Sequence, residues 1–307
     1  MMADNFVYMG GNQVVPFDVR RVRIHKSVKI VRRSAFLYRQ RLTYVEFHDE
    51  IEIIEEEAFE GCVSLRKVKL LGVKVIKADA FKDCSGLLDV EFGDKLETIE
   101  RQAFYNCNRL KNIRMPSVRT VGKEAFALCT TLLNVEFGEK LEMLQEKAFD
   151  TCRKLKRIVL PLKSNMIEDH VFILCEELET VDLTEAEGIH KLIASLHLES
   201  WRNEMNTEIN CINQVLPLNR HKIRLWMREI IDRLDHYKSE HHRLLKEATT
   251  LLELALWKAN LDDNNGGEGE GVRTTRSRRK RARKEICVTS GADVVIKNVL
   301  PFLQLLE

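Results

Sequence analysis

Apolar residues recur along most of the chain at a spacing of 22 or 23 residues. Each repeat carries an anchoring phenylalanine, with aliphatic residues five before it and six and nine after it. A unit of this length cannot bury an apolar face alone, so neighbouring units must stack and cover one another. The anchors are Phe36, Phe59, Phe81, Phe104, Phe126, Phe149 and Phe172.

Between successive anchors lies a triplet that alternates apolar, charged and apolar, as in Val90-Glu91-Phe92. Such alternation is typical of a short strand with one buried face. Strands at the same place in every unit would pair side by side, about 4.8 Å apart. The pattern therefore predicts an α/β repeat fold, a solenoid of parallel short strands over residues 19–188.

The repeating unit resembles a known class of repeat. Ala80, Phe81, Cys84, Leu87 and Val90 give the pattern Ala-Phe-x-x-Cys-x-x-Leu-x-x-Val, which resembles the BspA-like leucine-rich repeats. The resemblance covers about residues 19–188, and the tail from Ser195 resembles that of intracellular algal members. It implies a solenoid used for protein–protein contact, with no catalytic residues.

The ends of the array need covering, because terminal repeats expose their apolar faces. Residues 1–18 are predicted to form an N-terminal cap, and the segment after Leu183 can supply the other cap. The predicted cap residues at the N-terminus are Phe6, Val7, Val14, Val15 and Phe17.

A helical arm is predicted over residues 189–261. Between Met227 and Ala255 a series of residues spaced alternately three and four apart is apolar except for His241, which gives the heptad of a coiled coil. A helix over about 223–261 is expected, paired with a shorter helix over 200–216 to form a helical hairpin. The unpaired remainder would bind a partner helix or a second copy, through Met227, Ile230, Leu234, Leu244 and Leu251.

Charged residues alternate in sign at two outward positions of the repeat, so the true period is a double unit of 45 residues (104−59). One interpretation is structural, since opposite charges on neighbouring strands attract and like charges repel. The other is a charged recognition surface; we favour the structural one, because alternating signs cancel at a distance. The first series is Arg23, Glu46, Lys69, Glu91, Arg114 and Glu136. The second is Lys29, Glu52, Lys74, Glu97, Arg119 and Glu142.

Six cysteines occupy one position, three residues after the anchor. A disulfide or metal ladder is conceivable, but metal ligands usually lie two to four residues apart and these lie 22 or 23 apart. We interpret them as small buried side chains at a tight corner. No metal and no cofactor is expected. The six are Cys62, Cys84, Cys107, Cys129, Cys152 and Cys175.

Basic charge is concentrated near the C-terminus. The 307 residues carry a net charge of +2, yet residues 273–284 hold eight basic residues and no acid. The rest of the chain has 41 basic and 47 acidic residues and is therefore net acidic. This segment follows a Gly-rich linker, so 262–284 is predicted to be flexible, and 285–307 to form a short apolar strand and helix. A nuclear-import signal or a nucleic-acid contact is predicted at Arg278, Arg279, Lys280, Arg281, Arg283 and Lys284.

Several function classes lack support in the sequence. No window approaches the ~18 apolar residues of a membrane span, and the N-terminus lacks the pattern of a signal peptide. We therefore expect an intracellular protein, nuclear or cytoplasmic, with no membrane contact. No phosphate-binding glycine loop or nucleophilic triad is found in a suitable context. The sequence predicts a non-enzymatic protein–protein interaction scaffold; the alternative is a nucleic-acid-associated nuclear factor that uses residues 273–284.

Overall fold

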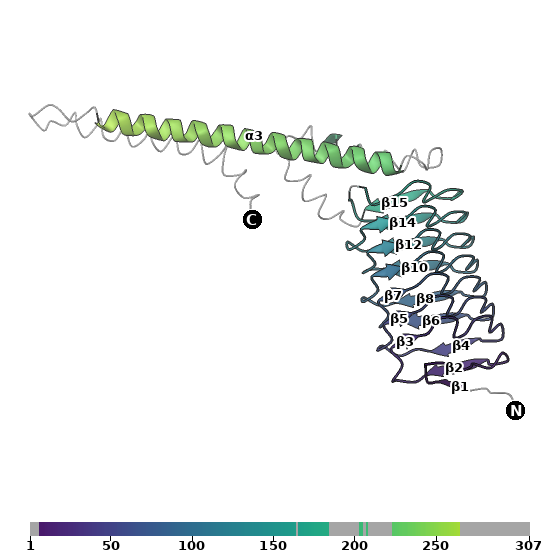
Figure 1. Cartoon of the computed structure of the whole chain (residues 1–307). Helices are drawn as coiled ribbons and strands as arrows, with labels where there is room; N and C mark the ends of the chain where they lie inside the picture. Colours follow the sequence, from purple (N-terminus) through teal and green to yellow (C-terminus); the bar gives the residue numbers. More distant parts are fainter. Residues whose placement is uncertain (1–5, 164, 184–202, 205–206, 208–222, 265–307) are drawn as a thin grey trace, which may run out of the picture. The chain divides into compact units, whose positions relative to one another are not determined.

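The computed structural model describes residues 6–163, 165–183, 203–204, 207 and 223–264 (Figure 1). The chain divides into two compact units, one of residues Met1–Ile193 with Arg202–Asp232 and one of Ala194–Trp201 with Arg233–Glu307. Each unit is described by itself. The first holds the predicted solenoid, which the structure confirms.

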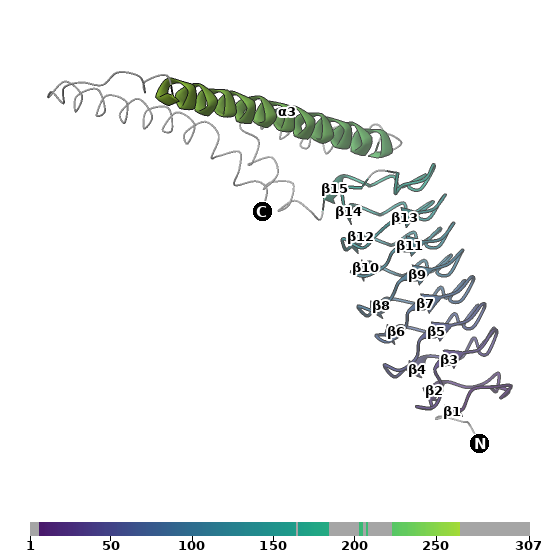
Figure 2. The ribbon, with the colours of Figure 1, turned by 60° about the vertical axis from the view of Figure 1, so that its left-hand side comes forward.

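We call one turn of the solenoid a rung. One strand from each rung contributes to the first of two parallel ladders of strands (Figure 2). Inward residues such as Val68 and Val90 lie opposite each other in parallel register. Outward residues alternate with them, as the sequence predicts. These long strands are β1 (Phe6–Tyr8), β2 (Arg21–Ile24), β4 (Tyr44–Glu46), β6 (Lys67–Leu70), β8 (Asp89–Phe92), β10 (Asn112–Met115), β12 (Asn134–Phe137), β14 (Arg157–Leu160) and β15 (Thr180–Leu183).

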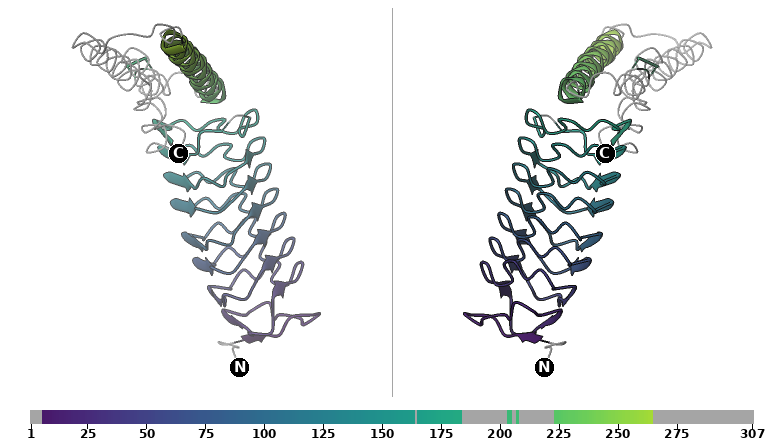
Figure 3. Two further views of the ribbon diagram at one scale, coloured as in Figure 1. Left: turned by 90° about the vertical axis from the view of Figure 1, so that its left-hand side faces the viewer. Right: turned by 90° about the vertical axis from the view of Figure 1, so that its right-hand side faces the viewer.

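The second ladder consists of two-residue strands that pair in one continuous parallel sheet. An isolated bridge from Leu144 to Ile167 continues it by one more rung. Figure 3 shows the rungs stacked, with the turns projecting away from the strands. The short strands are β3 (Ile30–Val31), β5 (Ile53–Ile54), β7 (Val75–Ile76), β9 (Thr98–Ile99), β11 (Thr120–Val121) and β13 (Met143–Leu144).

The core between the ladders is a column of stacked phenylalanine rings. The seven anchors follow one another with centroid separations from 4.7 Å to 6.0 Å, and their planes are nearly parallel. Six of the seven anchors are fully buried, and Phe172 in the last rung is 6% exposed. The predicted anchor positions are confirmed.

The cysteine column runs beside the rings. All six thiols are free and buried, and each donates a hydrogen bond to the carbonyl of the anchor one rung earlier. The Cys84 Sγ, for example, lies 3.1 Å from the Phe59 carbonyl oxygen. The interpretation as buried corner residues is confirmed, because a thiol is small enough for the corner and still provides a donor.

The turn around each anchor has a backbone conformation that the sequence does not predict. The residues two before and two after every anchor have positive φ, and among these positions only Gly61 is a glycine. This conformation turns alternate N–H groups toward the following rung, as where Tyr38 N–H donates to the Glu60 carbonyl. Thr151, a β-branched residue, adopts φ 57°, a region that such residues rarely populate. The hydrogen bonds between rungs hold it there.

The N-terminal cap differs from the prediction. Val15 is buried, but Val14 and Phe17 are 80% and 73% exposed, so their predicted burial is wrong. The pairing of β1 with β2 turns Tyr8 inward and Val7 outward, and the Tyr8 ring packs edgewise on Phe36. Tyr8 therefore takes the covering role that the sequence analysis gave to its neighbours.

Two polar side chains complete this end of the solenoid. The Gln13 side chain accepts a hydrogen bond from Met9 N–H and donates one to the Val7 carbonyl, which covers the free edge of β1. Arg39 stands where later rungs have cysteine; it is buried, donates to the carbonyls of Val15 and Leu37, and stacks on the Phe17 ring.

The predicted arm helix is present as α3 (Ile223–Asn264), 42 residues long. Ile230 and Leu234 are buried as predicted, Leu244 is half-buried, and Leu251 is 67% exposed, so its predicted burial is wrong. Heptad spacing identifies an apolar stripe but not how far a covering surface extends along it. The partner helix predicted over 200–216 lies outside the described residues, except that positions 203, 204 and 207 are helical.

Candidate interaction surface

The outward residues of the long strands form a continuous surface, which we call the long-strand face. It consists of the first and third residues of β2, β4, β6, β8, β10 and β12, whose burial alternates with that of the inward residues. The third residues form the charge ladder predicted from the sequence, with one charged side chain on each of β2, β4, β6, β8, β10 and β12. Its members are Arg23, Glu46, Lys69, Glu91, Arg114 and Glu136.

Ion pairs in the charge ladder join the rungs two at a time. The Arg23 Nε lies 2.8 Å from a Glu46 carboxylate oxygen, and this hydrogen bond raises the pKa of Arg23. Lys69 and Glu91 are joined at 2.9 Å, and Arg114 and the next acid, Glu136, at 3.0 Å. The basic residue always lies on the earlier rung.

The hydrogen bonding of the sheet follows the same pairing. Among the described strands, β2 pairs with β4, β6 with β8 and β10 with β12, whereas β4 and β6 are not hydrogen-bonded, nor are β8 and β10. Ion pairs within 4 Å are likewise missing from Glu46 to Lys69 and from Glu91 to Arg114 in this described part of the chain. In the middle of the array the 45-residue double unit is thus also a unit of hydrogen bonding, whereas at the two ends β1 pairs with β2 and β12 continues into β14 and β15.

A shallow groove of about 540 Å³ lies on the long-strand face where β8 and β10 are unpaired. Glu91 and Arg114 line it, and the nearly buried Val90 and Phe92 also contribute to its lining. The groove combines fixed charges of both signs with a small apolar area. Such a surface can hold polar and apolar side chains of another molecule at once.

The second charge series is also partly paired. Glu52 accepts a hydrogen bond from Lys74 Nζ at 3.0 Å, which lowers the pKa of Glu52, and Arg119 pairs with Glu142. Both pairs join residues of adjacent rungs beside the short strands. The second series therefore supports the stacking of the rungs in the same way as the first.

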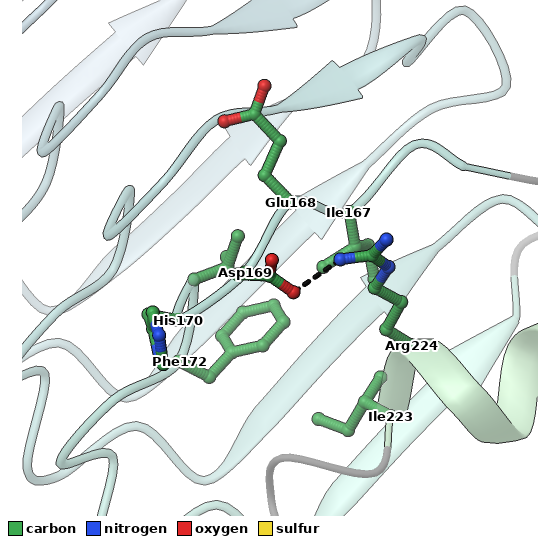
Figure 4. Close-up of a pocket in the computed structure, with 8 residues that line it drawn as sticks. Ile167, Glu168, Asp169, His170, Phe172, Ile223 and Arg224 are labelled. Carbon is green, nitrogen blue, oxygen red and sulfur yellow. Dashed lines mark hydrogen bonds and ion pairs between the residues drawn. The ribbon is translucent and has the colours of Figure 1, made fainter.

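A smaller pocket of about 160 Å³ lies in the first unit, at the last rung (Figure 4). Ile223 of α3 and Phe172 line it, and Arg224 donates a hydrogen bond to the Asp169 carboxylate across it. Ile223 is buried, so the first turn of α3 covers part of this rung. The segment directly after Leu183, which is the predicted cap, lies outside the described residues. Because Arg224 and Asp169 pair with each other, we interpret this pocket as a structural contact between α3 and the last rung.

The other predicted residues fall elsewhere. Met227, Ile230 and Leu234 of α3 are buried. The basic segment, residues 278–281 with 283 and 284, lies outside the described residues. Within the ranges that the structure describes, no group of three metal-ligating side chains occurs, and no helix is long and apolar enough to cross a membrane.

The chain was compared with known families and structures. A family model described as "BspA type Leucine rich repeat region" matches residues 17–117 and 74–192. No protein with a curated description matches the chain.

Solved structures of bacterial leucine-rich repeat proteins are similar to the solenoid. One from T. pallidum is 30% identical, with a TM-score of 0.42, over 43% of this chain and 63% of that one. One from Bacteroides ovatus is 23% identical, with a TM-score of 0.42, over 56% of this chain and 48% of that one. This chain thus spans less than two thirds of the length of either protein.

Proposed function

Because the chain belongs to the BspA-type leucine-rich repeat family, we propose that it is a non-enzymatic scaffold that binds other proteins through its long-strand face. Repeats of this family build scaffolds that commonly bind proteins. The observation that carries the proposal is the groove between β8 and β10 within a row of charged side chains. There the charged side chains of Glu91 and Arg114 lie beside the small apolar area of Val90 and Phe92.

The long-strand face is suited to binding because its side chains are already fixed. Lys69 and Glu91 hold each other, as do Arg114 and Glu136, so little side-chain freedom remains to be lost on association. The sheet beneath is held by the stacked anchors and does not need to reorganise. Specificity would come from the order of the charges along the ladder.

Site-specific photo-crosslinking tests this proposal. A photoreactive residue at Asn112, exposed in the groove, should capture a bound protein from cells that express the full chain. The matched control is the same residue at Lys123, which is also exposed but lies in a turn. Capture at both positions alike, or at Lys123 alone, would contradict binding through the long-strand face.

The helical arm is proposed as a second contact, for a partner helix or for a second copy. Leu251, Leu254 and Leu256 are exposed on α3, which is unusual for large apolar residues in a helix of mixed charge. The full chain with Leu251→Asp and Leu254→Asp should lose that association in sedimentation velocity. Unchanged sedimentation, with helix content retained, would remove the arm from the binding surfaces.

The basic segment supports a second candidate function, nuclear import or contact with nucleic acid. Its support is the concentration of eight basic residues in 273–284 within a chain that is otherwise net acidic. A reporter fused to residues 270–286 should enter nuclei, and one with residues 278–281 changed to alanine should not. Binding of the full chain to duplex DNA that is independent of salt concentration would argue against a phosphate contact.

A further inference from the structure

The charges of the charge ladder are complementary to the same charges in reverse order. Strand register places Val7 beside Arg23 at one end, and Val159 beside Glu136 at the other. Between these two apolar residues lie six charges that alternate in sign, beginning with a base and ending with an acid. If the series is reversed, every base falls on an acid. The series is Arg23, Glu46, Lys69, Glu91, Arg114 and Glu136; beyond Glu136 the register continues to Val159, which is buried, and to Asp182.

We propose that the partner of the long-strand face is a second copy of this chain, related by a two-fold axis that runs parallel to the strands between β6 and β8. This inference rests on the proposed function and names its partner. Rotation about such an axis reverses the order of the rungs and keeps the direction of the strands. Arg23 then lies opposite Glu136 of the second copy, Glu46 opposite its Arg114, and Lys69 opposite its Glu91. A two-fold contact of this kind uses the same surface on both copies.

The charge order selects this arrangement over the other face-to-face packing. A two-fold axis along the stacking direction would place each rung opposite the same rung of the second copy. Arg23 would then face Arg23, and Glu91 would face Glu91, so all six contacts would be repulsive. Like charges brought together in a contact cost affinity and suppress that mode of association. Only the arrangement with reversed rungs is attractive along the whole ladder.

The neighbouring column of first residues fits the same axis. In the reversed arrangement Lys67 lies opposite Asp89 of the second copy, and these two are also an ion pair within one chain, which raises the pKa of Lys67. Tyr44 lies opposite Asn112, and Arg21 opposite Asn134, so no like charges meet. The two columns therefore agree, although only the third residues alternate strictly.

The internal ion pairs strengthen this match. In every pair of the ladder the base precedes the acid, so the three pairs are dipoles with one common direction along the solenoid. Reversal of the rungs sets the dipoles of the two copies antiparallel, and each base gains a second acid. The exposed pairs are individually weak and are screened by salt. The dimer should therefore dissociate as ionic strength rises.

Charge reversal with mixing tests the proposal in the full chain. Leu251→Asp and Leu254→Asp are placed in every protein of this test, so that association through the arm does not contribute. Sedimentation velocity at low salt should then show a dimer when the ladder is unchanged, and Glu91→Lys and Lys69→Glu should each weaken the dimer at least tenfold. An equimolar mixture of these two variants should dimerise again, because position 69 of each then faces an opposite charge at position 91 of the other. Restored dimerisation also shows that both variants are folded.

The matched control is Glu146→Lys, which removes a carboxylate paired with Lys123 in a turn, outside the long-strand face. It should leave the dimer unchanged. A dimer that survives Glu91→Lys, or a mixture that stays monomeric, would overturn the proposed axis. Monomeric protein with the unchanged ladder at low salt would also overturn it, and capture of a different protein through Asn112 would then leave the proposed function standing.

Discussion

The inward column of anchors and the outward charge ladder of the same solenoid repeat with different periods. The anchors are identical in every rung, and their rings stack face to face at about one rung separation. The ladder alternates, and its partners change sign from each rung to the next. Identical apolar rings attract each other at this distance, whereas identical charges repel. The chemistry of each column therefore sets its own period.

The double period of the ladder also reaches the core. The fourth residue of a long strand, which points inward, is Phe92 or Phe137 on rungs whose ladder residue is acidic. On rungs whose ladder residue is basic it is Leu70 or Met115. Phe92 packs edgewise on Phe104, and Phe137 in the same way on Phe149. The two rungs of a unit thus differ in packing as well as in charge. The double unit is a property of the fold and not of its surface alone.

The largest expected effect comes from the thiols of the core column. Burial raises the pKa of Cys62 and Cys129 to about 12, and also raises the pKa of Cys84, Cys107 and Cys152. Above the ordinary thiol pKa of about 8.5 the unfolded chain loses these protons while the folded chain keeps them, so stability falls as pH rises. One pH unit above this ordinary pKa, each thiol lowers the free energy of unfolding by about 1.4 kcal/mol relative to neutral pH. Five thiols together lower it by about 7 kcal/mol.

Urea unfolding at pH 7.0, 8.5 and 9.5 measures this loss; these pH values bracket the ordinary thiol pKa of about 8.5. A control with Cys129→Ala and Cys152→Ala should be less stable at neutral pH but should lose less stability on the alkaline side. Equal slopes for the two proteins would show that the thiols do not control alkaline unfolding.

The second effect concerns the anchor column itself. Phe104→Ala removes a ring stacked between Phe81 and Phe126 and should lower the free energy of unfolding by roughly 3–5 kcal/mol. Because rungs contact only their neighbours, hydrogen exchange should accelerate most near that rung. Val14→Ala, at a residue that is 80% exposed, is the control and should change little. Uniform acceleration over the whole array would contradict the nearest-neighbour view.

A third test breaks the regularity of the core at its N-terminal end. Arg39→Cys restores the residue of the later rungs but removes three charged hydrogen bonds, two to Val15 in the cap and one to Leu37. We expect a loss of about 2–3 kcal/mol, with faster hydrogen exchange in residues 6–19, because hydrogen bonds to charged groups are strong. Arg41→Cys is the exposed control. Stabilisation by Arg39→Cys would mean that cysteine alone suffices at this position.

The smallest effect belongs to the charge ladder of the monomer. Glu91 pairs with Lys69 and not with Arg114 among the described residues, so a double-mutant cycle should find coupling only in the first pair. Exposed pairs contribute about 1 kcal/mol at most, and Glu91→Lys should cost more than Glu91→Gln. Thermal unfolding at low and high salt measures both. Equal coupling of Glu91 to Lys69 and to Arg114 would show that the ladder is continuous in solution.

The sequence predicted the rung well because side chains there follow one rule in every repeat. The anchors, the cysteines and the strand residue Val90 recur at fixed spacing and are buried as expected. The prediction failed at the N-terminal end of the solenoid and along the arm, where an element has no repeated neighbour beside it. Tyr8 covers the first anchor although Val14 and Phe17 were expected to do so, and Leu251 is exposed although it continues the heptad. Periodicity cannot show where a covering surface begins or ends.

The candidate surface was predicted in part. The sequence placed Glu91 on the outward side of a strand, but it gave no sign that Glu91 pairs with Lys69 alone or that a groove separates it from Arg114. Both features depend on which strands are hydrogen-bonded. Spacing in the sequence is nearly equal on either side of Glu91, so no local pattern distinguishes the two neighbours.

By itself the sequence determined the solenoid, because the period of apolar residues requires stacked units that share one core. It also determined the alternation of charge that makes the long-strand face complementary to its own reverse. Only the tertiary structure decided the backbone of the turns. Leu128 and Thr151 adopt positive φ, as Gly61 does, although their side chains oppose it. Their N–H groups donate to the carbonyls of the next rung, and these bonds exist only once the rungs are stacked.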